Sequence, residues 1–217
     1  LFARFYSCSK LLRHWASLRW DDSLDLRPGK LRLQARTLVG LLERSKTSGP
    51  DKKVRVLPIF VSREAFLETR WLEPGLKLLL KSDLSYERDY LVPLPNEHFD
   101  SFLQRRALYS DCVGFSRSLL ESLPLGGGEG RRLLLTEAAR YWTEHSDRSG
   151  LDTWCAALGH SSTRRNFLGR WTAGGSADKY VRAAYRTVEG LQISAALHAR
   201  ESFRGGPDFF GEEATLL

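Results

Sequence analysis

The chain has 217 residues, of which 42% are hydrophobic and 27% charged, so it can bury one sizeable core with at most a small accessory lobe. Lysine and arginine number 33 against 26 aspartates and glutamates, and the net charge of +7 comes mostly from arginine, which binds phosphates through paired hydrogen bonds. No apolar run approaches the roughly 20 residues of a membrane-spanning helix, and the first residues lack the design of a signal peptide. We therefore expect a soluble protein.

The three cysteines, Cys8, Cys112 and Cys155, lie far apart and are odd in number. They predict neither a disulfide framework nor a paired zinc site, and they fit a reducing, intracellular setting. The chain starts at Leu1, inside a helical pattern, and contains no methionine. We expect it to be the C-terminal part of a longer product with a further N-terminal domain.

The first third of the chain changes from a helical to an alternating pattern and back. Apolar residues at near-helical spacing over residues 3–20 predict an amphipathic helix. The stretch "KLRLQA" then alternates, and "ERSKTSGPDKKVRVLPIFV" places a Gly-Pro turn between a polar arm and an apolar strand at 54–61. We expect a β-hairpin with Lys46 near its tip, in a small antiparallel sheet with strands near 30–36 and 53–60.

The rest of the chain has a mainly helical pattern. Residues 63–81 indicate a helix, residues 82–100 a proline-containing connection, and residues 205–217 a Gly-rich, acidic tail that we expect to be disordered. Further helices are expected, with the linker "PLGGGEG" between the first two, at residues 101–122, 131–143, 148–158, 162–168 and 176–200. The expected fold class is mainly α with a small antiparallel β-sheet (α+β), in one domain over residues 1–204.

Three short segments of the C-terminal third, "HSDR", "LGRW" and "ADKYVRA", stand in a fixed register. Trp171 follows Arg148 after 23 residues, and Tyr180 follows Trp171 after nine. This order resembles the catalytic domain of the tyrosine recombinases and phage-type integrases, especially the Crypton-like branch of eukaryotic mobile elements. In that family an H-x-x-R motif, here His145 to Arg148, is followed at the same intervals by a His or Trp and by the nucleophilic tyrosine.

The resemblance reaches upstream and covers most of the chain, because "RSKTSGPDKKVRVLPIFV" resembles the family's β-hairpin that carries a catalytic lysine. It implies that Lys46 protonates the 5′-hydroxyl leaving group, that His145 assists proton transfer and that the Trp171 indole N–H donates to the phosphate. It also implies a homo-oligomer acting on double-stranded DNA without a cofactor, in the nucleus if the host is eukaryotic.

The residue types suit the cutting of DNA without metal or water, because a tyrosine keeps the bond energy in a covalent 3′-phosphotyrosine. Free tyrosine has a pKa near 10, so Tyr180 needs cationic neighbours or a base to attack at neutral pH. Negative charge grows on the non-bridging phosphate oxygens, and the Arg148 guanidinium is suited to stabilise it. Arg164, Arg165 and Arg170 lie nearby in the sequence and are candidates for phosphate contacts with bound DNA.

Each of these residues also has an ordinary structural interpretation. A tryptophan at a helix boundary usually packs in the core, an isolated histidine is usually a satisfied polar group, and a lysine in a polar hairpin is usually solvated. Tyr185 is a rival nucleophile, but it points about 140° away from Tyr180 on an ideal helix, so both cannot face one phosphate. "LGHSS" resembles the Leu-Gly-His segment of bacterial integrases, yet His160 lies only 12 residues after Arg148, and we interpret it as a turn residue at a helix end.

One position departs from the family pattern, which has a further arginine near the start of the domain and an acidic residue about three positions later. In "YSCSKLLRHWASLRWDD" the alignment puts Lys10 at the arginine and Arg13 at the acid. A lysine cannot make the arginine's fork to two phosphate oxygens. Either Arg13 substitutes, or the chain is a catalytically impaired relic, or both are solvated helix charges.

Three functions therefore stay open: an active site-specific recombinase or integrase of a mobile element, a DNA-binding relic of such an element, or an unrelated basic helical protein that binds nucleic acid or a partner. The helix over residues 181–200 carries Leu191, Ile193 and Leu197. In the resembled family the C-terminal segment docks on a neighbouring protomer, so we expect this helix to serve assembly, unless it closes its own core.

Overall fold

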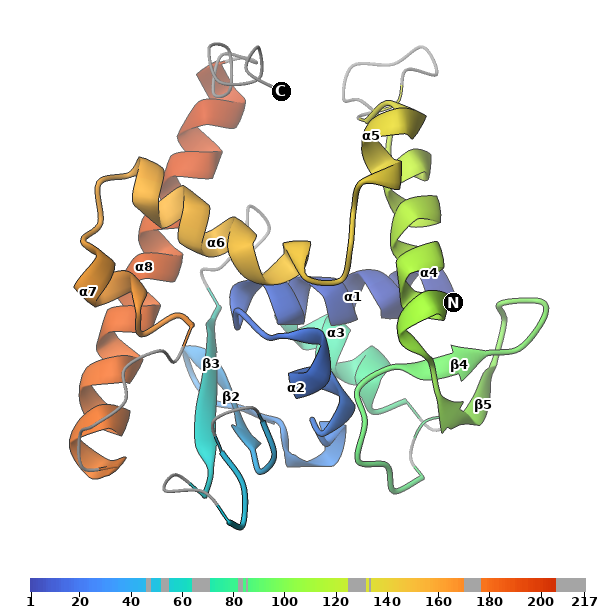
Figure 1. The fold of residues 1–217 in the computed structure, drawn as a ribbon, viewed down its shortest axis with the longest axis horizontal. Helices are drawn as coiled ribbons and strands as arrows, with labels where there is room; N and C mark the ends of the chain where they lie inside the picture. The colour runs from blue at the N-terminus through green and yellow to red at the C-terminus, as the bar shows by residue number, and fades with distance from the viewer. Residues whose placement is uncertain are drawn as a thin grey trace.

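The structure, a computed structural model, describes residues 1–45, 48–51, 55–63, 71–81, 84, 86–124, 132, 134–169 and 177–205, with the backbone alone described for 177–184 and 202–205. Within this part of the chain the α-helices are α1 Phe2–Trp15, α2 Trp20–Leu24, α3 Leu72–Leu79, α4 Tyr109–Ser122, α5 Thr136–Arg140, α6 Ser146–Ala157, α7 Ser162–Arg165 and α8 Ala177–Gly205. The strands are β1 Arg32–Leu33, β2 Thr37–Leu42, β3 Leu57–Ser62, β4 Pro93–Pro95 and β5 Phe102–Arg106. The expected α+β class is confirmed (Figure 1).

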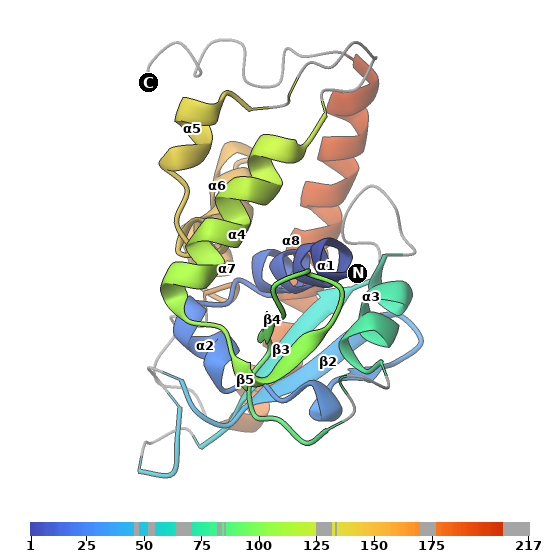
Figure 2. The same cartoon turned by 90° about the vertical axis from the view of Figure 1, so that its right-hand side faces the viewer.

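The strands with α2 and α3 form one end of the molecule, and α4, α5 and the C-terminal half of α8 extend from the other (Figures 1 and 2). Helix α1 crosses between the two ends and packs against α3, α4 and α6. Its buried face carries Phe5, Leu12 and Trp15, each about 1% exposed. This helix is therefore the centre of the hydrophobic core.

The crossing of α1 and α6 depends on a glycine. A Cβ on Gly150 would lie 2.5 Å from Cε1 of His14, so any larger residue would force the His14 ring to move. The His14 ring packs edge-on against Trp15 and against Trp154 of α6. The N-terminal turn of α6 is thereby held close to the C-terminal half of α1.

The main sheet has the order β1-β2-β3, and β2 and β3 pair antiparallel from Thr37 opposite Ser62 to Leu42 opposite Leu57. The expected hairpin is present, but its first strand is 37–42, which the sequence pattern did not reveal. Leu38, Gly40 and Leu42 are buried on one face of β2, but the less buried face carries the apolar residues Val39 and Leu41, so the segment "TLVGLL" lacks the polar-apolar alternation of a half-buried strand. Only two residues of the expected strand at 30–36 are strand, and Lys46 lies outside the described residues.

The expected helix at 3–20 is too long by its last turn, because α1 ends at Trp15. Ser17 has a φ of 47°, in the left-handed region, and the chain turns before α2 begins at Trp20. The backbone N–H of Arg19 donates to Asp22 Oδ2 at 2.9 Å, which caps α2. Arg19 therefore lies at the N-terminus of a short separate helix.

The expected helix at 101–122 is also too long at its start. Residues 102–106 form β5, which pairs with β4, and α4 begins at Tyr109. The expected helices at 148–158, 162–168 and 176–200 are found as α6, α7 and α8, and the expected helices at 63–81 and 131–143 contain α3 and α5. Residues 125–130 of the expected linker and residues 206–217 of the expected tail lie outside the described residues.

Helix α8 closes the core of its own chain. Leu191, Ala195 and Ala196 are at most 2% exposed. The buried Gln192 amide accepts from the Ser62 N–H at 2.7 Å and donates to the carbonyls of Trp15 and Phe60 at 2.7 and 2.8 Å. Truncation of the chain within α8 would therefore unfold the domain, so it cannot isolate a role in assembly.

Candidate functional site

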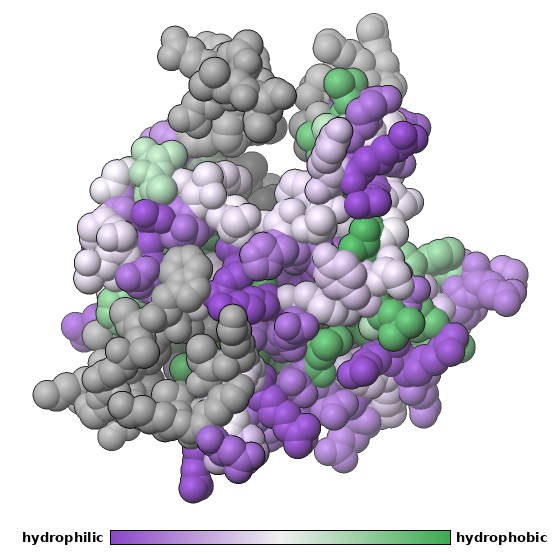
Figure 3. Space-filling view, viewed as in Figure 1, coloured by the Kyte–Doolittle hydropathy of each residue, from purple (hydrophilic) through white to green (hydrophobic). Residues whose placement is uncertain are grey.

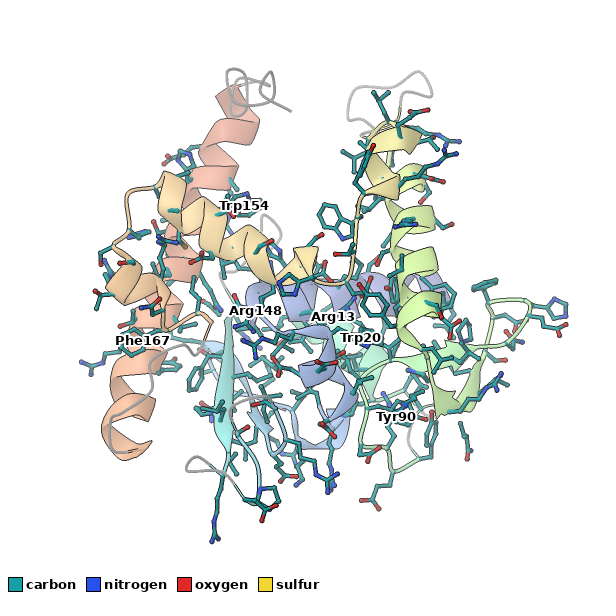
Figure 4. All side chains as sticks on the ribbon, viewed as in Figure 1. Arg13, Trp20, Tyr90, Arg148, Trp154 and Phe167 are labelled. Carbon is teal, nitrogen blue, oxygen red and sulfur yellow. The ribbon has the colours of Figure 1, made fainter. Side chains whose placement is uncertain are left out.

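Arg148 lies buried at a junction of three segments, below α6 and beside α1 and α2 (Figure 4). Its Nη1 donates to the carbonyl of Ser17 at 3.3 Å, and its Nη2 donates to the carbonyl of Gly169 at 2.8 Å. Asp22 Oδ2 lies 3.8 Å from Nη1. These contacts fix the plane of the guanidinium between the turn after α1 and the segment that leads to Trp171.

Arg19 is the residue that the sequence pattern missed. It is followed three residues later by Asp22, which is the spacing expected of the family's first arginine and its acid. Asp22 Oδ2 accepts from the Arg19 backbone N–H and lies 3.8 Å from Arg148 Nη1, so this carboxylate links the Arg19 backbone to the Arg148 guanidinium. The half-buried Arg19 side chain has no hydrogen bond or ion pair with any residue that the structure describes. The sequence "RWDD" could have indicated this pair of an arginine and an acid. It was overlooked because the helix expected at 3–20 included Arg19 and Trp20.

Lys10 and Arg13 lie elsewhere, in the interior between α1 and α6. The Lys10 ammonium is 2.9 Å from Asp147 Oδ1, and Arg13 pairs with Glu144 and, at 3.1 Å, with Asp147. Burial alone lowers the pKa of Arg13, but Asp147 and Glu144 raise it above its ordinary value. The interpretation of both as solvated helix charges is therefore wrong. Their partners are carboxylates of the same chain.

His145 precedes α6 and is exposed at the start of the turn that carries Arg148. Its carbonyl accepts from the Arg148 backbone N–H at 3.1 Å. The spacing of the H-x-x-R motif therefore places the imidazole at the surface and the guanidinium in the interior of one helical turn. Such a turn can offer a proton-transfer group and a fixed positive charge three residues apart.

The remaining candidates of the motif are described in part. Tyr180 lies in the first turn of α8, where only the backbone is described, and Lys46, Trp171 and Arg170 lie outside the described residues. Gly169, which binds Arg148, stands two residues before Trp171. The described chain therefore reaches Arg148 at Gly169. The positions of the Lys46, Trp171 and Tyr180 side chains stay predictions.

Tyr185 and His160 have structural contacts. The Tyr185 hydroxyl lies 2.8 Å from Thr37 Oγ1 of β2, and its ring packs edge-on against Phe60 of β3. His160 follows the end of α6, where Gly159 has a φ of 74°, and its Nε2 lies 2.9 Å from Ser194 Oγ. The interpretation of His160 as a turn residue at a helix end is confirmed.

The candidate DNA-contact arginines differ in their partners. Arg165 of α7 forms a bidentate pair with Asp152, with both N–O distances at 2.9 Å. Arg164 is exposed. In a space-filling view from the direction of Figure 1, hydrophilic residues occupy much of the middle and bottom of the described surface (Figure 3). A charge such as that of Arg164 is open to an anion, whereas that of Arg165 is already neutralised.

Among the described residues, no cluster of three or more histidine, cysteine or acidic side chains is placed to hold a metal ion. The three cysteines are free, and burial raises the pKa of Cys112 and of Cys155 to about 12. Neither of these two thiols can act as a thiolate nucleophile at neutral pH. In the same part of the chain no helix combines the length and the apolar character that crossing a membrane requires.

No protein-family model matches the chain, and no curated protein matches it. Among solved structures, the fold is similar to that of the FLP recombinase in a Holliday-junction complex, with a TM-score of 0.46 and 15% sequence identity. The similarity covers 85% of this chain and 45% of that one, so the chain spans less than half of the length of that recombinase.

Proposed function

We propose that the chain is the catalytic domain of a tyrosine recombinase, which breaks and rejoins DNA strands through a 3′-phosphotyrosine at Tyr180. The observation that supports this proposal is the position of Arg148. Its guanidinium binds both the turn that carries Arg19 and the segment that leads to Trp171. Arg148 of the motif is thereby held beside Asp22 and beside Gly169, which stands two residues before Trp171 in the sequence.

In the proposed reaction the Tyr180 hydroxyl oxygen attacks the scissile phosphorus. A bond from this oxygen to phosphorus forms while the bond from phosphorus to the 5′ oxygen breaks, and Lys46 supplies the proton to the leaving 5′ oxygen. His145 assists the transfer of the phenolic proton. Arg19 and Arg148 stabilise the charge on the non-bridging oxygens. The reverse attack by a 5′-hydroxyl releases Tyr180 and reseals a strand.

The pair of Arg19 and Asp22 favours an active enzyme over a relic. One part of the case for a relic, beside the start at Leu1 and the lack of methionine, was that Lys10 stands at the place of the first arginine. Arg19 supplies a guanidinium with its acid, Asp22, at the expected spacing, and Asp22 lies 3.8 Å from Arg148. A lysine at that place would lack the bidentate geometry that a phosphate requires.

The setting of the activity is part of the proposal. The resemblance to Crypton-like elements supports a mobile element as the source, and the net charge of +7 supports double-stranded DNA as the partner. The proposed enzyme acts as a homo-oligomer on DNA, inside the cell and in the nucleus if the host is eukaryotic.

A suicide substrate, whose nick lets the cleaved fragment diffuse away, tests the proposal by trapping protein covalently on DNA. The wild type should form the covalent complex and Tyr180→Phe should not, because the change removes the nucleophilic oxygen. Tyr185→Phe is the matched control and should retain the complex, since Tyr185 is held by Thr37 and Phe60. A wild type that binds DNA but forms no complex would leave the DNA-binding relic in place of the enzyme.

A further inference from the structure

Four charged side chains meet in the interior between α1 and the start of α6, and we call them the buried quartet: Lys10, Arg13, Glu144 and Asp147. Arg13 and Glu144 are both fully buried, and Lys10 and Asp147 are 9% and 3% exposed. Arg13 pairs with Glu144 and Asp147, and Lys10 pairs with Asp147 at 2.9 Å and lies 3.8 Å from Glu144. Each cation thus faces both carboxylates.

Two hydroxyl groups complete the buried quartet. The Tyr6 hydroxyl lies 2.9 Å from Ser116 Oγ of α4 and contacts Glu144 at 3.4 Å. Ser116 also donates to Glu144 and accepts from Lys10 at 2.9 Å. The quartet therefore joins α1, α4 and the turn before α6 in one polar network.

Stability alone does not account for this arrangement. Removing four charges from water is costly, and apolar side chains of similar volume are often at least as stable in such places. What the charges add is a fixed register. Lys10 and Arg13 are three residues apart on α1, and Glu144 and Asp147 are three residues apart at the start of α6. A shift of either segment by one residue would break the matched pairs and leave buried charges unpaired.

The turn that the quartet holds is the turn that carries the proposed site. Glu144 and Asp147 alternate in sequence with His145 and Arg148. The two carboxylates face the interior, while His145 is exposed and Arg148 reaches to Gly169. A displacement of this turn would therefore move the imidazole and the guanidinium together.

We propose that Glu144 and Asp147, clamped by Arg13 and Lys10, are positioning residues that set the place of His145 and Arg148 for the transfer reaction. The inference rests on the proposed function and adds a role for residues that do not touch the phosphate. Errors of about 1 Å in the place of a catalytic group can lower rates by about 100-fold. A loosened quartet should therefore slow cleavage more than it weakens DNA binding.

The decisive variant is Arg13→Met with Glu144→Met, which removes one charge of each sign and leaves Lys10 paired with Asp147. It should fold, keep its DNA affinity within about twofold, and cleave a saturating suicide substrate at least about tenfold more slowly. The affinity is measured in the Tyr180→Phe background so that no covalent product forms. Arg63→Met with Glu73→Met, which removes an ion pair with Arg63 34% and Glu73 54% exposed, is the matched control and should change neither quantity.

Amide hydrogen exchange gives a readout that does not need cleavage. The Arg148 N–H, bonded to the His145 carbonyl, should exchange at least about tenfold faster in the double variant, because its turn is loosened. The Leu158 N–H at the other end of α6, bonded to the Trp154 carbonyl, should be unchanged. Equal exchange at Arg148 in the variant and the wild type would overturn the inference, and so would a parallel acceleration at both ends, which indicates a general loss of stability.

If the double methionine variant fails to fold, Arg13→Gln with Glu144→Gln keeps polar side chains in the same volume and is measured in its place. A wild type without cleavage would refute the proposed function, and the exchange of Arg148 would still decide whether the quartet fixes the turn. Normal cleavage in a folded variant would refute the positioning role while the proposed function stands.

Discussion

The Arg148 guanidinium donates to the carbonyl of Gly169 at 2.8 Å and so joins α6 to the chain two residues before Trp171. Arg148→Lys keeps the charge but loses the planar fork. We expect the rate of covalent complex formation to fall by about 100-fold or more, because one fixed donor to a developing charge commonly contributes that much. Single-turnover cleavage of a suicide substrate measures it.

The same variant should lose about 1–3 kcal/mol of unfolding free energy, because the buried carbonyls of Ser17 and Gly169 lose donors. Urea unfolding checks this loss. Cleavage at the wild-type rate would show that Arg148 is a structural residue alone.

Substitutions of Arg19 and of Lys10 should have opposite effects on cleavage and on stability. Comparing the two variants decides which residue contacts the phosphate. Arg19→Ala should abolish cleavage and change the unfolding free energy by no more than about 0.5 kcal/mol, because the side chain is half-buried and its backbone N–H still binds Asp22. Lys10→Met breaks a buried ion pair and should cost about 3–5 kcal/mol of stability. Cleavage by Arg19→Ala at the wild-type rate would show that Arg19 does not contact the scissile phosphate.

DNA binding should weaken steeply with salt, because each neutralised phosphate releases counterions. Four phosphate contacts would reduce the affinity by about two orders of magnitude between roughly 50 and 200 mM salt. Arg164→Gln should reduce the slope of log affinity against log salt by about 0.9. Arg165→Gln should reduce it less, since Asp152 already neutralises that guanidinium. Fluorescence anisotropy of a labelled duplex gives both slopes, and binding that is indifferent to salt would count against a nucleic-acid role.

Helical periodicity predicted the long elements of the fold, since α1, α6 and α8 each bury one apolar face. It could not predict β2, because the less buried face of this strand carries the apolar residues Val39 and Leu41, which leaves no polar-apolar alternation to detect. The end of α1 was equally hidden. Leu18 continues the apolar pattern of the helix, while the turn is set by the φ of Ser17, which no residue type announces.

Residue spacing found the part of the site that is local in sequence, from His145 to Arg148. It missed Arg19, because the expected helix ran through residue 20. With no separate helix beginning there, "RWDD" could not be recognised as a helix N-terminus. The buried quartet was out of reach for another reason. Arg13 and Glu144 are 131 residues apart, and the sequence alone does not show that two such charges share the interior.

His14 should make the stability of the domain depend on pH. Burial between Trp15 and Trp154 lowers the pKa of His14, and Asp147 offsets this only in part while Lys10 adds to it. In the unfolded chain the pKa is about 6.5, so between the two values the unfolded state holds the proton more tightly. Protonation then favours unfolding. The contribution of His14 is complete above about pH 6.5 and is lost as the pH falls toward the lower folded value.

We therefore expect the unfolding free energy of the wild type to fall below about pH 6.5, with a slope from this residue of up to about 1.4 kcal/mol per pH unit. His14→Gln should flatten that part of the profile, although its stability at pH 7.5 is lower because the ring contacts with the two tryptophans are lost. Urea unfolding at about pH 7.5 and 5.0 measures the difference. Other groups titrate in the same range, so the quantity that decides is the wild-type slope minus the variant slope. Equal slopes would mean that His14 has the same pKa in the folded and the unfolded protein.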